Sequence, residues 1–275
     1  MRKLKLLFRV SRPVLWPIVP IIFLGGLWIG GSAFTLIPLI EFFLLSLPYC
    51  IFLYGINDVY DYETDKKNQR KGGAQGLKLQ KKYHKLVLRA AGMSIIPLVL
   101  VSLLTLNAAH ILALLLFLWV SYAYSAPPRL KSRPPLDSIT CAVLYVLLPF
   151  AIGFSLGKPL TELPIQIYAI TLGAIGMHAY STLMDYHADK RAGDTTFSIR
   201  FGKRGTAAFA CAMFLIAYLI GFSTLLLNVY ILLGVLLFAY SIWQPTRTTT
   251  TVVSCIMYLS FVLVSLAIFS QQFIS

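Results

Sequence analysis

The sequence predicts an all-α polytopic membrane protein, with nine transmembrane helices around a central cavity and a polar site on the cytoplasmic side. Three observations favour this class. Hydrophobic residues make up 58% of the 275 residues and charged residues only 12%, whereas a soluble domain carries about a quarter charged residues. The mean hydropathy is +0.76. Apolar segments of membrane length follow one another, and basic residues collect in alternate connections between them.

Nine segments are apolar over lengths that suit a membrane-spanning helix, which needs roughly 20 residues. In chain order they are Pro13–Ile29, Leu36–Gly55, Leu86–Leu106, Ile111–Tyr124, Ser138–Leu156, Pro164–Met184, Thr206–Phe222, Val229–Trp243 and Val252–Phe269. The fourth and the eighth are short, so a count of eight stays open. No soluble domain or long linker interrupts the series, so we expect residues 1–275 to form a single transmembrane domain.

The distribution of the net charge of +14 is explained by membrane topology rather than by nucleic-acid binding. With nine spans and the N-terminus inside, 23 of the 24 Lys and Arg residues lie on the cytoplasmic side, and Lys158 alone lies outside. This is the distribution that the positive-inside rule describes. We therefore expect an integral protein of a prokaryotic cytoplasmic membrane with a cytoplasmic N-terminus, and no nucleic-acid binding.

Two acidic clusters stand at the ends of even-numbered segments. The first is the run Asn57–Asp65 and the second is Asp185–Asp189. Only 10 Asp and Glu residues occur in the chain, and seven lie in these stretches when Asp194 is included. Carboxylates beside hydrocarbon are costly and usually mark function. The alternative, that they are solvated residues which pair with neighbouring bases, fits a single acid better than two clusters.

The spacing of the acids predicts a magnesium site. Asp58, Asp61 and Asp65 fall on one helical face, as do Asp185 and Asp189. Oxygen ligands suit Mg²⁺, which in turn bridges to phosphate oxygens. The predicted metal ligands are Asn57, Asp58, Asp61, Asp65, Asp185 and Asp189, and the predicted phosphate-binding bases are Lys66, Arg70, Lys71, Arg129 and Lys190. Glu63 points away from this face and is expected to be solvated.

A third cytoplasmic motif runs from Tyr124 to Pro135 and contains four prolines. Prolines stiffen a loop because they fix the backbone angle φ. We expect this loop to place Tyr124 and Lys131 over the diphosphate. An interfacial aromatic residue at the end of a span and a purely topogenic lysine are the alternatives, and both stay open.

These three motifs, in the order in which they occur along the chain, resemble the UbiA superfamily of intramembrane prenyltransferases. The first matches at Asn57, Asp58, Asp61, Asp65, Asn68 and Arg70, the second at Asp185 and Asp189, and the third from Tyr124 to Lys131. One departure is that Lys71-Gly72-Gly73 follows Arg70 where the family often has a second Arg-Pro. Finer features, among them Ser11-Arg12-Pro13, are most similar to lycopene elongases.

The resemblance implies a Mg²⁺-dependent enzyme. An isoprenyl diphosphate donor would ionise at the acidic clusters, and a lipophilic acceptor such as lycopene would enter from the membrane lipid and attack the allylic cation. The residues implied in catalysis are Asp58, Asp61, Asp185, Asp189, Tyr124 and Lys131. His178 and Tyr180 are predicted substrate contacts, although the core position is the favoured interpretation of His178 on general grounds.

Three alternatives remain. The acceptor can be an aromatic quinone precursor of the 4-hydroxybenzoate or naphthoate type. The apolar segments offer no deep basic residue for an aromatic acid, which favours an apolar acceptor. An ion transporter is disfavoured because Glu41 is the only acid well inside a segment. A non-catalytic lipid-binding protein would have no use for paired carboxylates.

Overall fold

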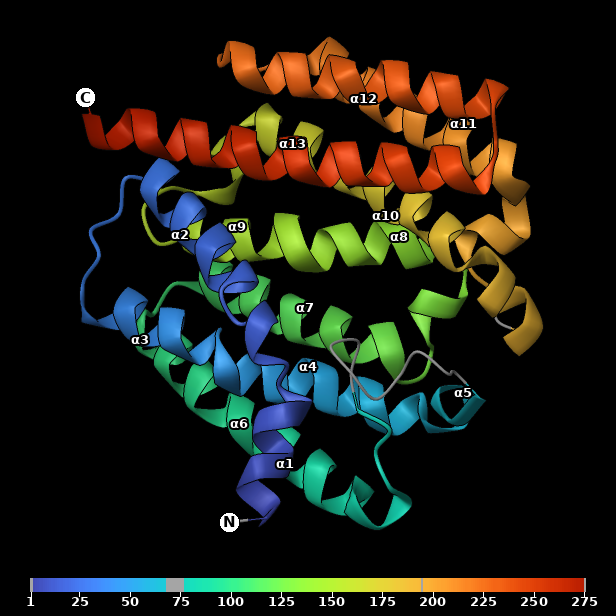
Figure 1. The fold of residues 1–275 in the computed structure, drawn as a ribbon. Helices are drawn as coiled ribbons and strands as arrows, with labels where there is room; N and C mark the ends of the chain where they lie inside the picture. The colour runs from blue at the N-terminus through green and yellow to red at the C-terminus, as the bar shows by residue number, and fades with distance from the viewer. Residues whose placement is uncertain (1, 68–76, 194, 275) are drawn as a thin grey trace. The chain divides into compact units, whose positions relative to one another are not determined.

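The described part of the chain is built from helices, as the apolar segments predict. The structure is a computed structural model and describes residues 2–67, 77–193 and 195–274. It divides into two compact units, which we describe separately (Figure 1). Unit 1 holds residues 1–130 and 143–163, and unit 2 holds residues 131–142 and 164–275.

Unit 1 carries the N-terminal segments. Its helices are α1 (Arg2–Val10), α2 (Ile18–Ile29), α3 (Leu36–Leu44), α4 (Leu47–Tyr60), α5 (Tyr62–Lys67), α6 (His84–Leu104), α7 (Ala108–Ser125) and α9 (Leu148–Phe154). Helices α2 and α9 pack with their backbones in close contact. A Cβ atom on Gly26 would lie 2.0 Å from the carbonyl oxygen of Phe150, and one on Gly153 would lie 2.0 Å from that of Phe23. Small residues permit this approach, as they do between other membrane helices.

Two predicted segments of unit 1 are interrupted, and a proline explains each break. The second segment is two helices, because α3 ends at Leu44 and α4 restarts at Leu47 with Pro48 in its first turn. In the fifth segment a π-helical turn, Val143–Leu147, precedes Pro149. Proline has no N–H to give to the helical ladder, and a wider turn accommodates the loss. This segment also crosses between the units, because its first part, α8 (Leu136–Ala142), belongs to unit 2.

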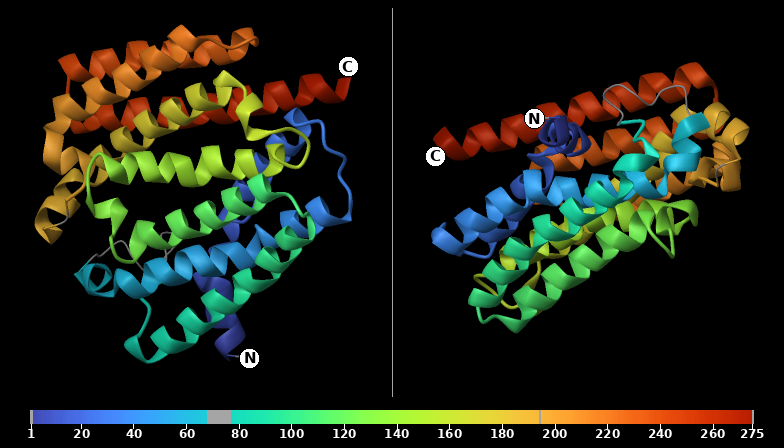
Figure 2. Two further views of the ribbon diagram at one scale, coloured as in Figure 1. Left: turned by 180° about the vertical axis from the view of Figure 1, so that it is seen from behind. Right: turned by 90° about the horizontal axis from the view of Figure 1, so that it is seen from below.

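Unit 2 carries the C-terminal segments. Besides α8 it contains α10 (Ile165–Ala192), α11 (Phe197–Ile220), α12 (Leu225–Trp243) and α13 (Arg247–Ile274). Figure 2 shows α11 and α12 lying alongside each other. Phe214 and Phe238 pack in their shared core, with ring centroids 5.0 Å apart. Helix α11 is kinked at Gly202, whose φ of 69° is a left-handed conformation that glycine adopts readily.

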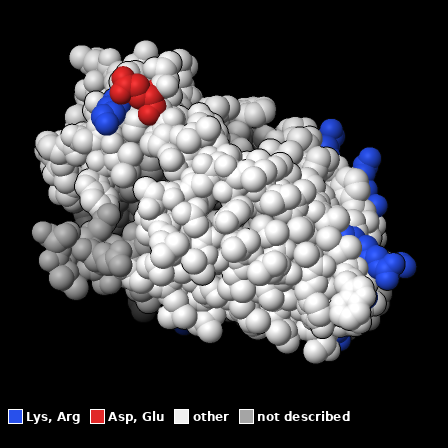
Figure 3. All heavy atoms as spheres, turned by 90° about the horizontal axis from the view of Figure 1, so that it is seen from above, with Lys and Arg blue, Asp and Glu red and all other residues white. Residues whose placement is uncertain are grey.

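The helices have the length and the surface of membrane spans. Seven of those in the described chain are long and apolar enough to cross a bilayer, and the bent pair Lys3–Val10 and Pro13–Ile29 makes an eighth if it forms one span. Helix α10, which corresponds to the sixth predicted segment, has 28 residues but is more polar and is not among these candidates. Large apolar side chains such as Leu106 and Leu219 are exposed. Figure 3 shows one face on which charged side chains stand at the edges of a broad uncharged area. A bilayer would cover such a surface.

Candidate active site

The first acidic cluster lies at the C-terminal end of α4. Asn57 and Asp58 stand in the last turn of the helix, and Asp61 is the residue that ends it. The predicted single face is therefore interrupted at Asp61, and Asp65 lies on the short helix α5. Carbonyl groups give the end of a helix a partial negative charge, which disfavours carboxylates there. The cluster consequently needs cations.

Arg12 supplies the first of these cations. Its Nη2 atom donates to Oδ1 of Asp58 at 2.7 Å and to Oδ1 of Asn57 at 3.4 Å. The Asp58 side chain is fully buried and that of Arg12 is 16% exposed. The guanidinium also stacks 4.4 Å from the ring centroid of Tyr54, a cation–π contact. Arg12 thus neutralises a buried carboxylate that has very little access to water.

Arg129 supplies the second cation. Its Nη1 donates to the carbonyl oxygen of Tyr60 at 2.8 Å, and its Nη2 donates to Oδ1 of Asp61 at 3.2 Å. It therefore caps the end of α4 and pairs with the acid there. Arg12 and Arg129 share a second property: their φ angles are 51° and 57°, in the left-handed region that non-glycine residues rarely adopt. Such backbone strain is concentrated at functional sites.

The other predicted residues of unit 1 stand around this pairing. Asn57 donates through Nδ2 to the Ser125 hydroxyl at 3.0 Å, and Asp65 is 7% exposed. Lys66 is exposed, with its ammonium 5.4 Å from the ring centroid of Tyr62. Tyr124 is half-buried in the last turn of α7. Glu63 is exposed, Lys131 begins the part of the proline-rich loop that belongs to unit 2, and Arg70 and Lys71 lie outside the described residues.

The second acidic cluster lies near the C-terminal end of α10. Asp185 and Asp189 are one helical turn apart and half-buried, and Lys190 is exposed. Gly193 ends the helix with φ of 79°, and its N–H donates to the carbonyl oxygen of Asp189 at 2.9 Å. Both clusters therefore occupy the carbonyl end of a helix, where a cation is favoured.

The two residues of α10 that were predicted to contact substrate, His178 and Tyr180, lie in different surroundings. His178 is half-buried, and its Nδ1 lies 3.0 Å from the Ser138 hydroxyl. Tyr180 is 0% exposed, and its hydroxyl lies 2.7 Å from that of Ser241 in the core of unit 2. The substrate contact of Tyr180 stays a prediction, and in this structure the side chain is packed in the core. The two residues are two positions apart, so they lie on different sides of the helix and only His178 keeps an accessible face.

Two residues escaped the sequence reasoning. Arg12 was counted among the topogenic bases and within the Ser11-Arg12-Pro13 resemblance, but not among the site residues. Asp137 was an isolated acid; it is 2% exposed, and its carboxylate accepts from the N–H groups of Ser138 at 2.8 Å and Phe197 at 3.1 Å. It ties the start of α11 to the start of α8. The signal for Asp137 would have been an acid at the first turn of a helix, where it satisfies free N–H groups.

The oxygen atoms of the first cluster are suitable ligands for Mg²⁺, because they belong to carboxylate and amide groups. In this structure these oxygens accept hydrogen bonds from two guanidinium groups, which supply the positive charge. Within either unit, no three acidic, histidine or cysteine side chains of the described chain stand ready around a metal position. Mg²⁺ needs only one or two carboxylates when water and phosphate complete its shell.

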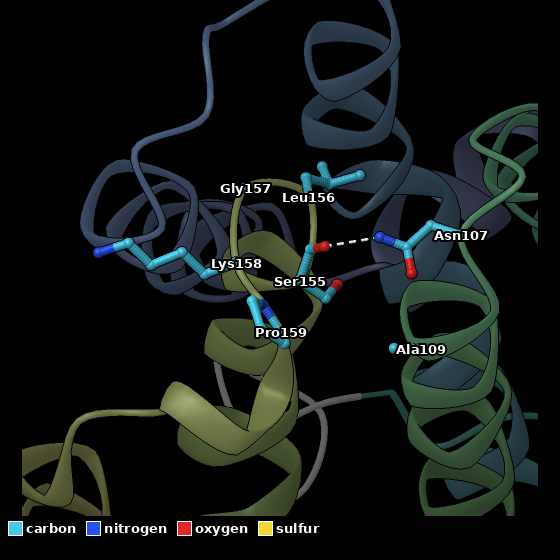
Figure 4. Close-up of a pocket in the computed structure, with 7 residues that line it drawn as sticks. All are labelled: Asn107, Ala109, Ser155, Leu156, Gly157, Lys158 and Pro159. Atoms are coloured by element: carbon cyan, nitrogen blue, oxygen red, sulfur yellow. Dashed lines mark hydrogen bonds between the residues drawn. The ribbon is translucent and has the colours of Figure 1, made fainter.

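A separate polar group in unit 1 lies away from the acidic cluster. Oε1 of Glu41 on α3 is 2.9 Å from Nε2 of His110 on α7, and both side chains are fully buried. The other ring nitrogen of His110 is 3.1 Å from the Ser155 hydroxyl. Ser155 and Asn107 line an open pocket of about 360 Å³ (Figure 4). Asn107 is directed toward the Ser155 carbonyl and donates to it at 2.7 Å, so the pocket wall is held by this bond.

Known proteins resemble this chain in sequence over most of its length. A lycopene elongase/hydratase of Corynebacterium glutamicum is 33% identical over 222 residues, which are 79% of this chain and 76% of that protein. A lycopene elongase/hydratase of Halobacterium salinarum is 31% identical over 247 residues, or 86% of this chain and 84% of that protein.

Solved structures resemble it in fold. A structure of a digeranylgeranylglyceryl phosphate synthase superposes with a TM-score of 0.78 at 20% identity and covers 97% of both chains. A UbiA homologue from Archaeoglobus fulgidus, bound to DMAPP and Mg²⁺, superposes with a TM-score of 0.59 at 23% identity, covering 94% of this chain and 99% of that one. The UbiA prenyltransferase family matches residues 18–252. This confirms the family resemblance seen in the motifs: the chain is an enzyme that belongs to the UbiA prenyltransferase family.

Proposed function

We propose that this enzyme is a Mg²⁺-dependent intramembrane prenyltransferase that ionises an allylic isoprenyl diphosphate and transfers the prenyl group to a carotenoid such as lycopene. The observation that carries the proposal is the pairing of Asp58 and Asp61 with Arg12 and Arg129 at the carbonyl end of α4. Such a group offers oxygen ligands to a metal ion and forked N–H donors to phosphate.

The described residues have different proposed roles in binding the metal and the diphosphate. Asp58, Asp61 and Asp65, with the Asn57 oxygen, are the proposed Mg²⁺ ligands on α4 and α5, and Asp185 and Asp189 are the proposed Mg²⁺ ligands on α10. When bound, the metal supplies Lewis-acid stabilisation to the departing diphosphate. Arg12 and Arg129 have side chains suited to bidentate phosphate contact, and Lys66, Lys131 and Lys190 add point charges. Arg70 and Lys71 stay sequence predictions for the same role.

The choice of a carotenoid acceptor rests on the relatives. Lycopene elongase/hydratases from bacteria and archaea match this chain at 30–33% identity. A relative from Dietzia named as a C50 β-cyclic carotenoid biosynthesis protein is 31% identical over 78% of this chain, which spans half of that longer protein. A carotenoid is soluble in the bilayer and would enter from the lipid. An aromatic quinone precursor remains the alternative acceptor.

We also propose nine crossings, with α10 as the span that carries the second acidic cluster. The polarity of α10 suits a helix that lines a reaction site. With this count the N-terminus and both clusters lie on the cytoplasmic side of a prokaryotic membrane, and residues 1–275 form one catalytic domain. Thiol labelling of single cysteines placed at Lys158 and Lys190 tests the topology, because the two positions should label from opposite sides.

An assay in membrane vesicles tests the activity. The vesicles receive Mg²⁺ and radiolabelled dimethylallyl diphosphate, with either lycopene or 4-hydroxybenzoate as acceptor. Label in a larger carotenoid is the expected result. Label only in the aromatic product would overturn the carotenoid assignment and keep the reaction type. Absence of label in both, repeated with longer allylic donors, would overturn the proposed function.

A further inference from the structure

We propose that His178 is the base that receives the proton released when the prenylated acceptor cation collapses, and that Ser138 and Asp137 position it. The inference rests on the proposed function. When an alkene attacks an allylic cation, a new cation remains on the acceptor. It becomes neutral by losing a neighbouring proton or by adding water and losing one of the water protons. Either route needs a base inside an apolar site.

The location of His178 on α10 suits this step. It precedes Asp185 by seven residues, so the two side chains share a face and stand about 10 Å apart along the helix axis. In the proposed reaction the new carbon–carbon bond forms at the allylic carbon next to the diphosphate, and the proton then leaves an acceptor carbon beyond that bond. A ring about two helical turns deeper than the acid would face this part of the acceptor. Among the α10 residues before Asp185, His178 is the only one with a basic side chain.

Neighbouring hydroxyl groups on this face do not compete as bases. The Ser181 hydroxyl donates to the carbonyl oxygen of His178 at 2.7 Å, and the Thr182 hydroxyl donates to that of Ala179 at 2.7 Å. Both hydroxyl protons are held by carbonyl groups of α10, and the Thr182 oxygen also accepts from the Ser198 N–H at 3.1 Å. Among the described residues the imidazole makes one hydrogen bond, through Nδ1. Its Nε2 atom makes no hydrogen bond there and is not among the fully buried polar atoms.

Ser138 offers His178 a partner that leaves the other ring nitrogen free to act as a base. The Asp137 carboxylate accepts from the Ser138 N–H at 2.8 Å, which holds the Ser138 main chain in place. A hydroxyl oxygen has lone pairs that can accept a bond from a ring N–H. We propose that the His178 ring donates its Nδ1–H to Ser138 across the 3.0 Å contact. In that tautomer Nε2 carries the lone pair, which is the atom a general base needs.

The step balances in both routes. For an alkene product, a C–H bond beside the cationic carbon breaks, its electron pair forms the double bond, and the proton moves to Nε2. For an alcohol product, a water oxygen forms a C–O bond with the cation while one water proton moves to Nε2. The imidazolium gives that proton to water after the product leaves, which restores the neutral ring.

The test compares His178→Gln, Ser138→Ala and Ser181→Ala in the vesicle assay. Glutamine keeps a donor for Ser138 but is not a base, and Ser181→Ala is the matched control because that hydroxyl does not touch the ring. We expect His178→Gln to lower product formation by about 100-fold or more, the usual contribution of a general base. Ser138→Ala should give a smaller loss and Ser181→Ala none.

A deuterium isotope effect distinguishes a base from a packing residue. Deuterium on the acceptor carbons beside the cationic centre should give a larger effect in His178→Gln than in the wild type, because proton loss becomes rate-limiting. Carotenoid products made in H₂¹⁸O report the water route. Wild-type rate, isotope effect and product ratio in a folded His178→Gln protein would overturn the inference. If that variant misfolds, an unchanged isotope effect in Ser138→Ala overturns it instead.

Failure of the inference and of the proposed function give different results. An active wild type with a fully active His178→Gln variant contradicts only the role of His178. If the wild type prenylates only an aromatic acceptor, the same isotope test applies at the ring carbon that loses its proton. A wild type that releases no diphosphate from any allylic donor contradicts the proposed function and this inference together.

Discussion

Replacing Arg12 should make the protein depend on magnesium for its stability. Arg12→Met keeps much of the side-chain volume but removes the charge that neutralises Asp58. The Asp58 side chain is fully buried at the carbonyl end of α4, so the carboxylate would remain without that guanidinium. A divalent metal bound to the same oxygens would replace the missing positive charge. The variant should therefore be destabilised without metal and recover when Mg²⁺ is added.

The size of the effect follows from the geometry. Removing one partner of a buried ion pair costs about 3–5 kcal/mol. Because Arg12 is 16% exposed, water screens part of the interaction and the lower end, about 3 kcal/mol, applies. For a chain of this size each kcal/mol shifts the Tm by roughly 2–4 °C, so the metal-free variant should melt roughly 6–12 °C below the wild type. Arg12→Lys should fall between the two, since lysine keeps the charge but not the fork.

Thermal unfolding in detergent, with EDTA and with excess Mg²⁺, measures this difference. Arg9→Met serves as the control, because Arg9 is an exposed base of the same segment. The double variant Arg12→Met with Asp58→Asn should be more stable than Arg12→Met alone, since the uncompensated charge is gone. Equal destabilisation of Arg12→Met with and without Mg²⁺ would refute the reasoning, as would a double variant whose losses simply add.

Three other changes have defined outcomes. Asp58→Ala, Asp61→Ala and Asp185→Ala should each abolish prenyl transfer while the protein still inserts into the membrane, and Glu63→Gln should be nearly silent. Turnover in vesicles measures the activity, and membrane fractionation measures insertion. A large loss of activity in the Glu63 variant would place the metal on another face of the helix. EDTA should stop turnover and added Mg²⁺ restore it, so full activity in EDTA would exclude the metal-dependent mechanism. Glu41→Leu should lower the free energy of unfolding by about 1–3 kcal/mol, because it leaves Nε2 of the buried His110 without a hydrogen bond, and Glu41→Gln by less. Equal melting temperatures for the two variants would contradict this.

Apolar length predicted the helices because burial in lipid dominates their formation. Each of the nine segments corresponds to a helix or to a pair of helices in the structure, including α10. The breaks were harder to foresee. Pro48 and Pro149 stand inside predicted segments, but the sequence does not say whether a proline ends a helix, bends it or widens one turn.

The acidic residues of the first cluster and Arg129 were candidates from the sequence, whereas the pairing of these acids with Arg12 and Arg129 was not foreseen. Asp58 and Asp61 were visible because acids are rare in this chain and these two repeat at helical spacing. Arg12 lies 46 residues from Asp58 in the sequence, and no local pattern links the two. The contact of Tyr180 with Ser241 was not foreseen for a related reason, because it spans 61 residues. Long-range pairing depends on how helices pack, and a single sequence does not encode this in its periodicity.

In the metal-free protein, the repulsion between the carboxylates of the first acidic cluster and the carbonyl end of α4 is offset by two arginines. Asp58 and Asp61 stand at the end of α4 where the helix dipole opposes them, and Arg12 and Arg129 neutralise them. Both arginines hold left-handed backbone conformations beside prolines, so their main chains are held in place while their long side chains can still turn. A metal ion that takes the carboxylate oxygens would release two guanidinium groups at that point. The same two residues would then be available to hold the diphosphate that arrives with the metal.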